Sequence, residues 1–107
     1  MVKVRNYKKH LLEQLKDHEE AASYLNAALQ DDDPHVFLLA LRDIAEAQGG
    51  MSWLAEQADL NRESLYRTLS LRGNPRFFNL LSVLSAFGLE LSINTISKRK
   101  RGRSRVS

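Results

Sequence analysis

Residues 51–77 read MSWLAEQADLNRESLYRTLSLRGNPRF, and this stretch decides the fold. It contains two short helical patterns with three residues between them. Ser52 is placed to cap the first pattern and Asn61 to cap the second. In the second pattern Leu65 and Leu69 form an inward apolar stripe. The stretch therefore predicts a helix, a tight turn and a second helix.

The same stretch meets the requirements of a helix-turn-helix. Such a motif needs a small residue where its helices cross, an apolar residue in the turn, and inward apolar residues on the second helix, whose other face enters the major groove. Ala55 and Leu60 meet the first two requirements. The outward residues can contact both phosphates and base edges, and they are Arg62, Glu63, Tyr66, Arg67 and Ser70. The alternative is an ordinary helical hairpin with a solvated charged face.

Two helices are predicted upstream of this motif. Asp17 is a possible N-cap, and apolar residues spaced by three and four predict a helix over about 18–30. The run DDDP then ends this helix and starts the next, with Asp33 as a new N-cap and Pro34 at the first helical position. The next helix is predicted from Pro34 to about Gln48. Its apolar residues cover more than one face, so we expect the central core helix here, ended by two glycines.

A fifth helix and a short strand are predicted downstream. Apolar residues recur at helical spacing from Phe77 to Phe87, after a loop that contains Gly and Pro. Leu89, Leu91 and Ile93 alternate with Glu90, Ser92 and Asn94, which is the period of a strand, predicted over 89–96. A lone strand needs a partner. The candidates are residues 2–6 and the same strand of a second subunit.

Charge divides the chain into parts. Residues 98–107 hold six of the 16 basic residues and none of the 13 acidic ones, so this end carries +6 while residues 1–97 carry −3. We interpret it as a disordered basic tail attracted to phosphate, the alternative being a merely solubilising end. Residues 1–16 are interpreted as a basic arm with a short helical turn, and 17–97 as the helix-turn-helix domain, with the motif at about 51–71.

Several classes of function are disfavoured. The chain has 107 residues, enough for one small domain, and no cysteine, which excludes disulfide scaffolds and thiolate metal sites. The three histidines lack metal-ligand spacing, and no nucleophile lies in a recognisable strained turn. We find no spanning segment or export signal. We therefore expect a cytoplasmic protein that is not an enzyme, with no metal and no cofactor.

Five aromatic residues could suggest a ligand site, but their helical spacing favours core or dimer packing. They are Tyr24, Trp53, Phe77, Phe78 and Phe87.

The run LAEQADLNRESLYRTLS, followed by RGNPRF, resembles the helix-turn-helix of phage-repressor-like, or Xre-type, regulators. From about Tyr24, through Leu39, Leu41, Ile44 and Ala45, to FGLELSI, the chain is similar to addiction-module antidote proteins of the HigA type. The resemblance covers about residues 7–96. One departure is Asp59, where such motifs commonly have glycine. A residue at positive φ costs about 1 kcal/mol or more, and Asp is among the tolerated substitutes.

The resemblance implies an all-α fold, a five-helix DNA-binding domain plus the short C-terminal strand. It implies an antitoxin of a type II toxin–antitoxin module: a homodimeric repressor that regulates transcription by binding double-stranded operator DNA and neutralises a small basic toxin of the RelE/HigB type. A stand-alone repressor without a toxin is the main alternative. A helical adaptor that binds only protein is a more distant one.

The expected DNA-binding residues follow from the motif and the resemblance. Either Arg62 or Arg67 is expected to contact guanine, and Glu63 cytosine, each pair giving about 1–3 kcal/mol of discrimination. The full expected set is Ser52, Asn61, Arg62, Glu63, Ser64, Tyr66, Arg67, Arg72, Asn74 and Arg76. Acidic residues of the first helices offer a complementary surface for a basic toxin, although acidic first turns are also what any helix prefers. These are Glu19, Glu20, Asp31, Asp32 and Asp33.

Overall fold

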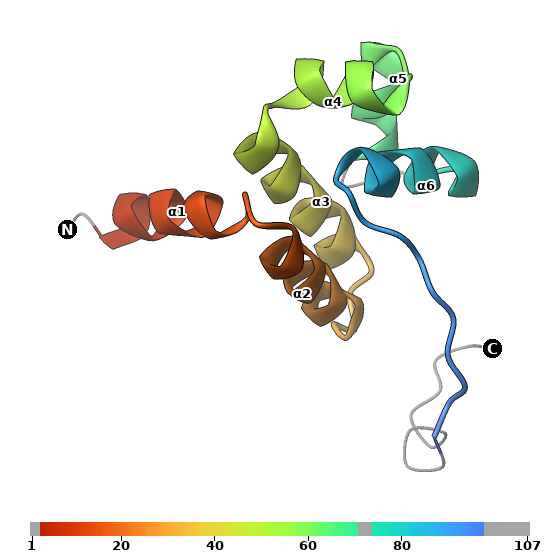
Figure 1. The fold of residues 1–107 in the computed structure, drawn as a ribbon, viewed down its shortest axis with the longest axis horizontal. Coiled ribbons are helices and arrows are strands. Elements are labelled where there is room, and N and C mark those ends of the chain that lie inside the picture. The colour runs from red at the N-terminus through yellow and green to blue at the C-terminus, as the bar shows by residue number, and fades with distance from the viewer. Residues whose placement is uncertain (1–2, 71–73, 98–107) are drawn as a thin grey trace.

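The structure is a computed structural model that describes residues 3–70 and 74–97. Over these residues the fold is all-helical (Figure 1). The helices are α1 (Lys3–Gln14), α2 (His18–Leu29), α3 (His35–Gln48), α4 (Met51–Ala58), α5 (Arg62–Thr68) and α6 (Phe77–Ala86).

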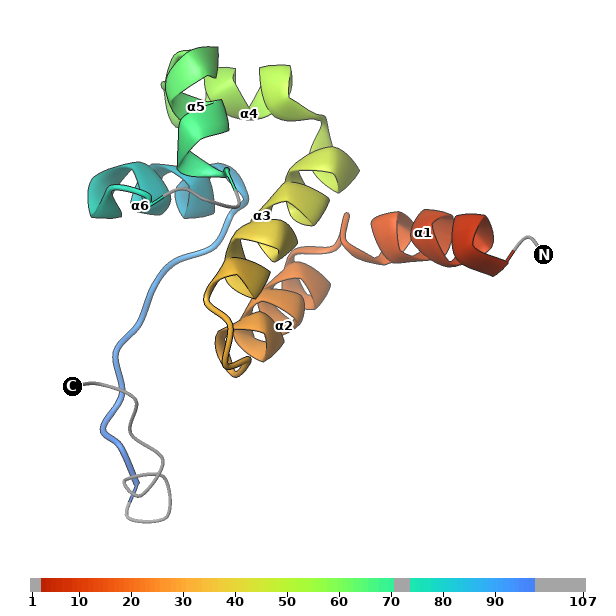
Figure 2. The same cartoon turned by 180° about the vertical axis from the view of Figure 1, so that it is seen from behind.

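Helix α3 lies at the centre of the molecule, as its two-sided apolar pattern predicts. Helices α1 and α2 contact it on one side, and α4 follows at its C-terminal end, where α4 also contacts α5 and α6 (Figures 1 and 2). The core is continuous across these contacts. Its largest fully buried side chains are Leu15, Leu41, Ile44, Leu54, Leu65, Leu69, Val83 and Phe87.

The starts of α2 and α3 follow from local sequence. The Asp17 carboxylate accepts a hydrogen bond from the Glu20 amide at 3.1 Å, which caps α2 as predicted. Helix α3 begins one residue later than predicted, with Pro34 at its N-cap position. Asp33 Oδ1 nevertheless accepts from the His35 amide at 3.0 Å, so its carboxylate still satisfies a free amide of the first turn.

The N-terminal prediction is wrong in part. A basic arm with a short helical turn is expected over 1–16, whereas α1 is a helix of 12 residues; the five other helices of the described chain lie within 17–97, where five are expected. Tertiary contacts explain the difference. Leu15 is buried against the core, Leu11 packs partly against it, and Lys8 pairs with Glu46 of α3 at 3.3 Å. Most helical stability comes from such packing rather than from propensity.

The predicted strand over 89–96 does not form in the single chain. No residue of 3–70 or 74–97 is in a strand, and the segment leaves α6 without regular structure. One of its two candidate partners is removed as well, because residues from Lys3 onward are helical. The basic tail, 98–107, lies outside the described residues.

The five aromatic side chains divide into two groups. Trp53 and Phe87 stack in the core, with ring centroids 6.5 Å apart. The Tyr24 hydroxyl donates to Asp43 Oδ2 at 2.7 Å, which joins α2 to α3. Phe77 and Phe78, by contrast, are 54% and 77% exposed, so the core of the single chain does not bury them.

None of the helices in the described part of the chain has the length and apolar character needed to cross a membrane.

Candidate nucleic-acid interface

Helices α4 and α5 are joined by a turn whose geometry depends on one left-handed residue. Asp59 has φ 58° and ψ 45°, and no other described non-glycine residue has positive φ. The Leu60 amide donates to the Ala55 carbonyl at 3.0 Å and the Asp59 amide to the Glu56 carbonyl at 3.3 Å. This pair of bonds is a Schellman motif, which ends α4 and satisfies its last carbonyls. Asp59, which stands where such motifs commonly have glycine, therefore adopts the positive φ that the motif requires.

The second helix begins as predicted and turns its apolar side inward. Asn61 Oδ1 accepts from the Ser64 amide at 2.7 Å, so Asn61 is the N-cap of α5. Leu65 and Leu69 are buried at 0% and 1% exposure. Ala55 of α4, which contacts α5, is buried as well. The prediction for the first cap is wrong. Helix α4 begins at Met51 with Gly50 as its N-cap, so Ser52 lies exposed within the first turn.

The outward face of α5 is polar and accessible. Arg62, Glu63 and Arg67 are exposed, and Tyr66 is 49% exposed. Thr68 is buried, and its hydroxyl donates to a backbone carbonyl of the same helix at 2.8 Å. Burial thus separates an inner side of α5 that packs on α4 from an outer side that is free to meet a ligand.

An open groove of about 420 Å³ lies between α5 and the start of α6. It brings together four of the residues that sequence assigns to DNA: Ser64 and Arg67 on α5, and Asn74 and Arg76 before α6. Its other lining residues are Thr68, Pro75 and Asn79. Arg62, Glu63, Tyr66 and Ser52 do not line this groove, and Arg72 lies outside the described residues.

Sequence reasoning missed Asn79, which lines the groove from the first turn of α6. It lies three positions after Arg76, the N-cap residue of α6, so both lie toward the same side of the helix start. The motif pattern ends at the loop before α6 and carries no signal for this position. Only the packing of α6 against α4 brings it beside α5.

The electrostatics of this region favour an anion. Between Leu60 and Asn79 the chain has four arginines and a single acidic residue, Glu63. The three of these arginines that the structure describes form no ion pair with other described residues, and all three are exposed. Guanidinium groups with no carboxylate partner are suited to bidentate contacts with phosphate or with the edge of guanine.

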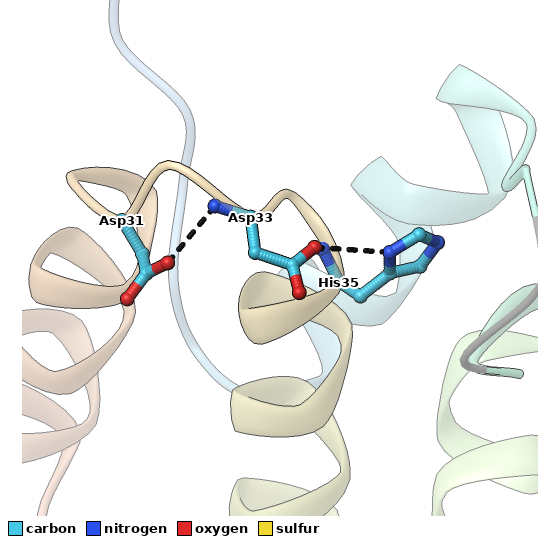
Figure 3. Close-up of polar contacts among 3 residues, drawn as sticks. All are labelled: Asp31, Asp33 and His35. Atoms are coloured by element: carbon cyan, nitrogen blue, oxygen red, sulfur yellow. Dashed lines mark hydrogen bonds and ion pairs between the residues drawn. The ribbon is translucent and has the colours of Figure 1, made fainter.

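The predicted acidic surface lies on α2 and on the turn between α2 and α3. Part of it has a structural role (Figure 3). Asp31 Oδ1 accepts from the Asp33 amide at 2.9 Å, and Asp33 Oδ1 accepts from both the amide and the ring Nδ1 of His35 at 3.0 Å. The bonds from the His35 backbone and ring lower the pKa of Asp33. Asp33 is therefore held in place beside the first turn of α3, where its carboxylate satisfies a free amide.

Glu19 and Glu20 differ from the turn aspartates. Their carboxylates are exposed in the first turn of α2 and form no hydrogen bond or ion pair with the described residues. Negative charge at a helix N-terminus is favourable in itself. The acidic surface thus contains two carboxylates that a partner could bind without disturbing a cap.

No group of three or more histidine or acidic residues within 3–70 and 74–97 is arranged to hold a metal ion.

Comparison with known proteins identifies the family. The family model described as "Probable addiction module antidote protein" matches residues 6–95, most of the chain. An uncharacterized protein of Haemophilus influenzae is 42% identical over 81 residues, which cover 76% of this chain and 82% of the relative. No solved structure matches. The chain belongs to the family of probable addiction module antidote proteins.

Proposed function

We propose that this protein is the antitoxin of a type II toxin–antitoxin module, which binds its operator DNA through a helix-turn-helix made of α4 and α5. The observation that carries the DNA-binding part is the groove between α5 and α6, lined by Ser64, Arg67, Asn74 and Arg76. Membership of the antidote family supports the antitoxin part. It also favours this function over that of a repressor without a toxin.

The groove suggests how the DNA-binding residues divide their work. Arg67 and Arg76 share the groove with small polar side chains, a combination that suits a phosphate, whose contacts fix register without reading sequence. Arg62 and Glu63 lie in the first turn of α5, outside the groove. We assign these two to base edges in the major groove, because the first turn of a recognition helix contacts the bases.

One domain of this size covers one half-site. A symmetric pair with recognition helices about 34 Å apart reads two half-sites. We therefore propose a homodimer that binds a near-palindromic operator.

The toxin surface is assigned to the acidic residues of α2 and of the turn that follows it, Glu19, Glu20, Asp31, Asp32 and Asp33. Residues 11–59 contain 11 acidic and two basic residues, a net charge of −9, whereas residues 60–79 carry +3. A small basic toxin of the RelE/HigB type would be complementary in charge to the acidic residues within 11–59. Because opposite charges are concentrated in different parts of the sequence, DNA and toxin would bind through separate residues.

DNA binding is tested by fluorescence anisotropy with the DNA upstream of the coding sequence and with a scrambled duplex. We expect Arg67→Ala to weaken binding to both duplexes and to lower the slope of log K against log salt by about 1. Arg62→Ala is expected to lose about 1–3 kcal/mol of discrimination between the duplexes. Lys9→Ala removes an exposed positive charge from α1 and is the matched control. Equal binding by all four proteins would refute the assignment.

The toxin is tested by co-expression with the adjacent reading frame. We expect a small basic protein to co-purify, and the double variant Glu19→Gln with Glu20→Gln to retain less of it while binding DNA as the wild type does. Glu13→Gln with Glu46→Gln is the control, since these carboxylates pair with lysines on α1 and at its end. DNA binding with no partner protein would identify a plain repressor instead.

A further inference from the structure

The segment after α6 has an apolar edge that the single chain leaves exposed. Leu91 is 49% exposed and Ile93 is 92% exposed, while alternate positions carry Glu90, Ser92 and Asn94. Beyond Leu89, no backbone group of this segment bonds to the backbone of another described residue. Its alternation is that of a strand and its hydrogen-bonding groups are those of an unpaired strand edge.

The described chain offers this edge no strand to pair with. The N-terminal residues that could have paired with it are in α1 from Lys3 onward, and none of the described residues forms a strand. Both views of the ribbon show the segment descending from α6 on the side of α3 away from α1 (Figures 1 and 2). A pairing partner must therefore come from another molecule.

An apolar groove of about 310 Å³ lies beside the start of this segment. Leu89, Glu90 and Leu91 line it from this segment, and Leu25 and Leu29 are among the residues that line it from α2. Leu29 is itself 47% exposed. In a strand, residues two apart lie on the same face, so pairing would place Leu89, Leu91 and Ile93 on one face, of which Leu89 and Leu91 line the groove. Ile93 lies beyond the groove and does not line it.

We infer that residues 89–96 pair in antiparallel fashion with the same residues of a second copy, about a two-fold axis at Ser92, and that each Ile93 enters the groove of the other copy. In this register Leu91 lies opposite the partner's Ile93, because the positions of paired residues are symmetric about Ser92. Leu91 lines the groove, so the side chain opposite it is directed there. The inference rests on the proposed homodimer and specifies its interface.

The charge of the following residues favours antiparallel pairing of the two copies, and the side-chain pattern favours this register. The segment is followed in sequence by the run KRKR at 98–101. A parallel pairing would bring two such runs together, whereas an antiparallel pairing directs them to opposite ends. A shift by one residue would place Asn94 opposite Leu91 and turn one copy's apolar face to solvent. The register at Ser92 keeps the apolar faces of both copies together.

The first test is the oligomeric state of the full chain, without DNA or toxin, measured by sedimentation equilibrium. We expect a dimer, and we expect Ile93→Asp to raise its dissociation constant by about tenfold or more, because an unpaired carboxylate would enter an apolar groove. Phe78→Asp is the matched control, since Phe78 is 77% exposed on α6 outside this interface. Circular dichroism and urea unfolding verify that each variant is folded.

The second test uses the absence of cysteine from the chain. At the proposed axis the two Cα atoms of residue 92 lie about 4.5–5.5 Å apart, which is within reach of a disulfide. Ser92→Cys is expected to form a covalent dimer on mild oxidation. Ser85→Cys, at an exposed position on α6, is expected to remain monomeric on a denaturing gel under the same conditions.

A monomeric wild type, a dimer unaffected by Ile93→Asp, or a dimer abolished by Phe78→Asp would overturn the inference. So would a toxin that pairs with a monomeric antitoxin through residues 89–96, detected as co-purification lost in Ile93→Asp. Failure of the proposed function is distinguishable, because the sedimentation and cross-linking measurements contain neither DNA nor toxin. A dimer that binds neither ligand would refute the function and leave the interface standing.

Discussion

Asp59 is the residue that sets the path of the chain from α4 into α5. It occupies the left-handed region at φ 58°, where a glycine has no Cβ penalty. We expect Asp59→Gly to raise the free energy of unfolding by about 0.5 kcal/mol, since relief of the penalty exceeds the entropy that glycine loses on folding. Asp59→Ala is expected to lower it by about 1 kcal/mol, because alanine keeps the Cβ and lacks the local hydrogen bonding of aspartate. Urea unfolding of the three proteins measures both changes.

Equal stability of Asp59→Gly and Asp59→Ala would show that the left-handed conformation is not retained in solution. The same two variants separate the effect of backbone strain at residue 59 from the effect of its charge on DNA binding. Both remove a negative charge beside α5, the proposed DNA-binding helix, so under that proposal both are expected to bind the operator somewhat more tightly at low salt.

Tyr24 and Asp43 form a hydrogen bond whose contribution depends on pH. Burial, and then the Asp43 carboxylate that accepts this bond, raise the pKa of Tyr24 above its ordinary value of 10.0. The protonated phenol therefore stabilises the fold fully below pH 10, and this contribution is lost as the pH rises above it. We expect Tyr24→Phe to lower the free energy of unfolding at pH 7 by about 1 kcal/mol. The difference from wild type should shrink between pH 10 and 11.

Urea unfolding at a series of pH values measures the effect of this bond. Tyr66→Phe is the control, because Tyr66 is 49% exposed and its hydroxyl forms no hydrogen bond with the described residues. A loss for Tyr24→Phe that stayed constant across this pH range would contradict the assigned hydrogen bond.

At the scale of elements, the end of α6 is fixed to the start of α2. His18 Nδ1 lies 2.7 Å from the Phe87 carbonyl oxygen and donates to it, while Gly88 ends the helix at φ 80°. A Cβ on Gly88 would lie 2.8 Å from the His18 ring. We expect Gly88→Ala to lower the free energy of unfolding by about 2 kcal/mol, because backbone strain and the displaced ring act together. Thermal or urea unfolding measures the loss.

A double-mutant cycle with His18→Ala separates these two causes. Without the imidazole ring, the atoms nearest to the added methyl group are removed, and the backbone strain of residue 88 remains. We therefore expect Gly88→Ala to cost less in the His18→Ala background than in the wild type. Additive losses would mean that the ring does not restrict this position.

Local signals predicted the elements that local chemistry determines. The Asn61 cap and the left-handed Asp59 depend on neighbours in sequence, so α5 and the turn before it could be predicted. Helix α1 could not, because its support comes from contacts with α3 far along the chain. Ser52 is a plausible cap by residue type, but α4 already begins at Met51, directly after the glycines that end α3, so Ser52 lies inside the helix.

The candidate site shows the same division between local and distant contacts. The pattern of the motif predicted which side of α5 faces outward, and burial of Leu65 and Leu69 agrees with it. The groove between α5 and α6 was beyond prediction, since it depends on how α6 packs against α4. The strand over 89–96 was predicted from its alternation, but a strand forms only with a partner that the single chain does not contain.

At the scale of the whole molecule, positive charge is concentrated in three stretches of the sequence: residues 1–10, which carry +4, α5 with its loop, and the last ten residues. Residues 60–79 carry +3 and residues 98–107 carry +6, against −9 for residues 11–59. Since each phosphate neutralised adds about 0.9 to the magnitude of the salt slope, the terminal residues can contribute several units. We expect deletion of 98–107 to lower that magnitude by about 2 to 5. Anisotropy at about 50–200 mM salt measures it.

The same deletion should leave sequence discrimination unchanged, because in the proposed division of roles residues 98–107 are attracted to phosphates, which carry no sequence information, while Arg62 and Glu63 contact the bases. The ratio of affinities for the operator and a scrambled duplex is therefore expected to be equal for the full chain and the shortened one at each salt concentration. Arg62→Ala changes that ratio in the proposed division of roles, so the two variants are complementary. A ratio that fell with the deletion would mean that the last residues contact bases, and an unchanged slope would mean that they do not reach the DNA.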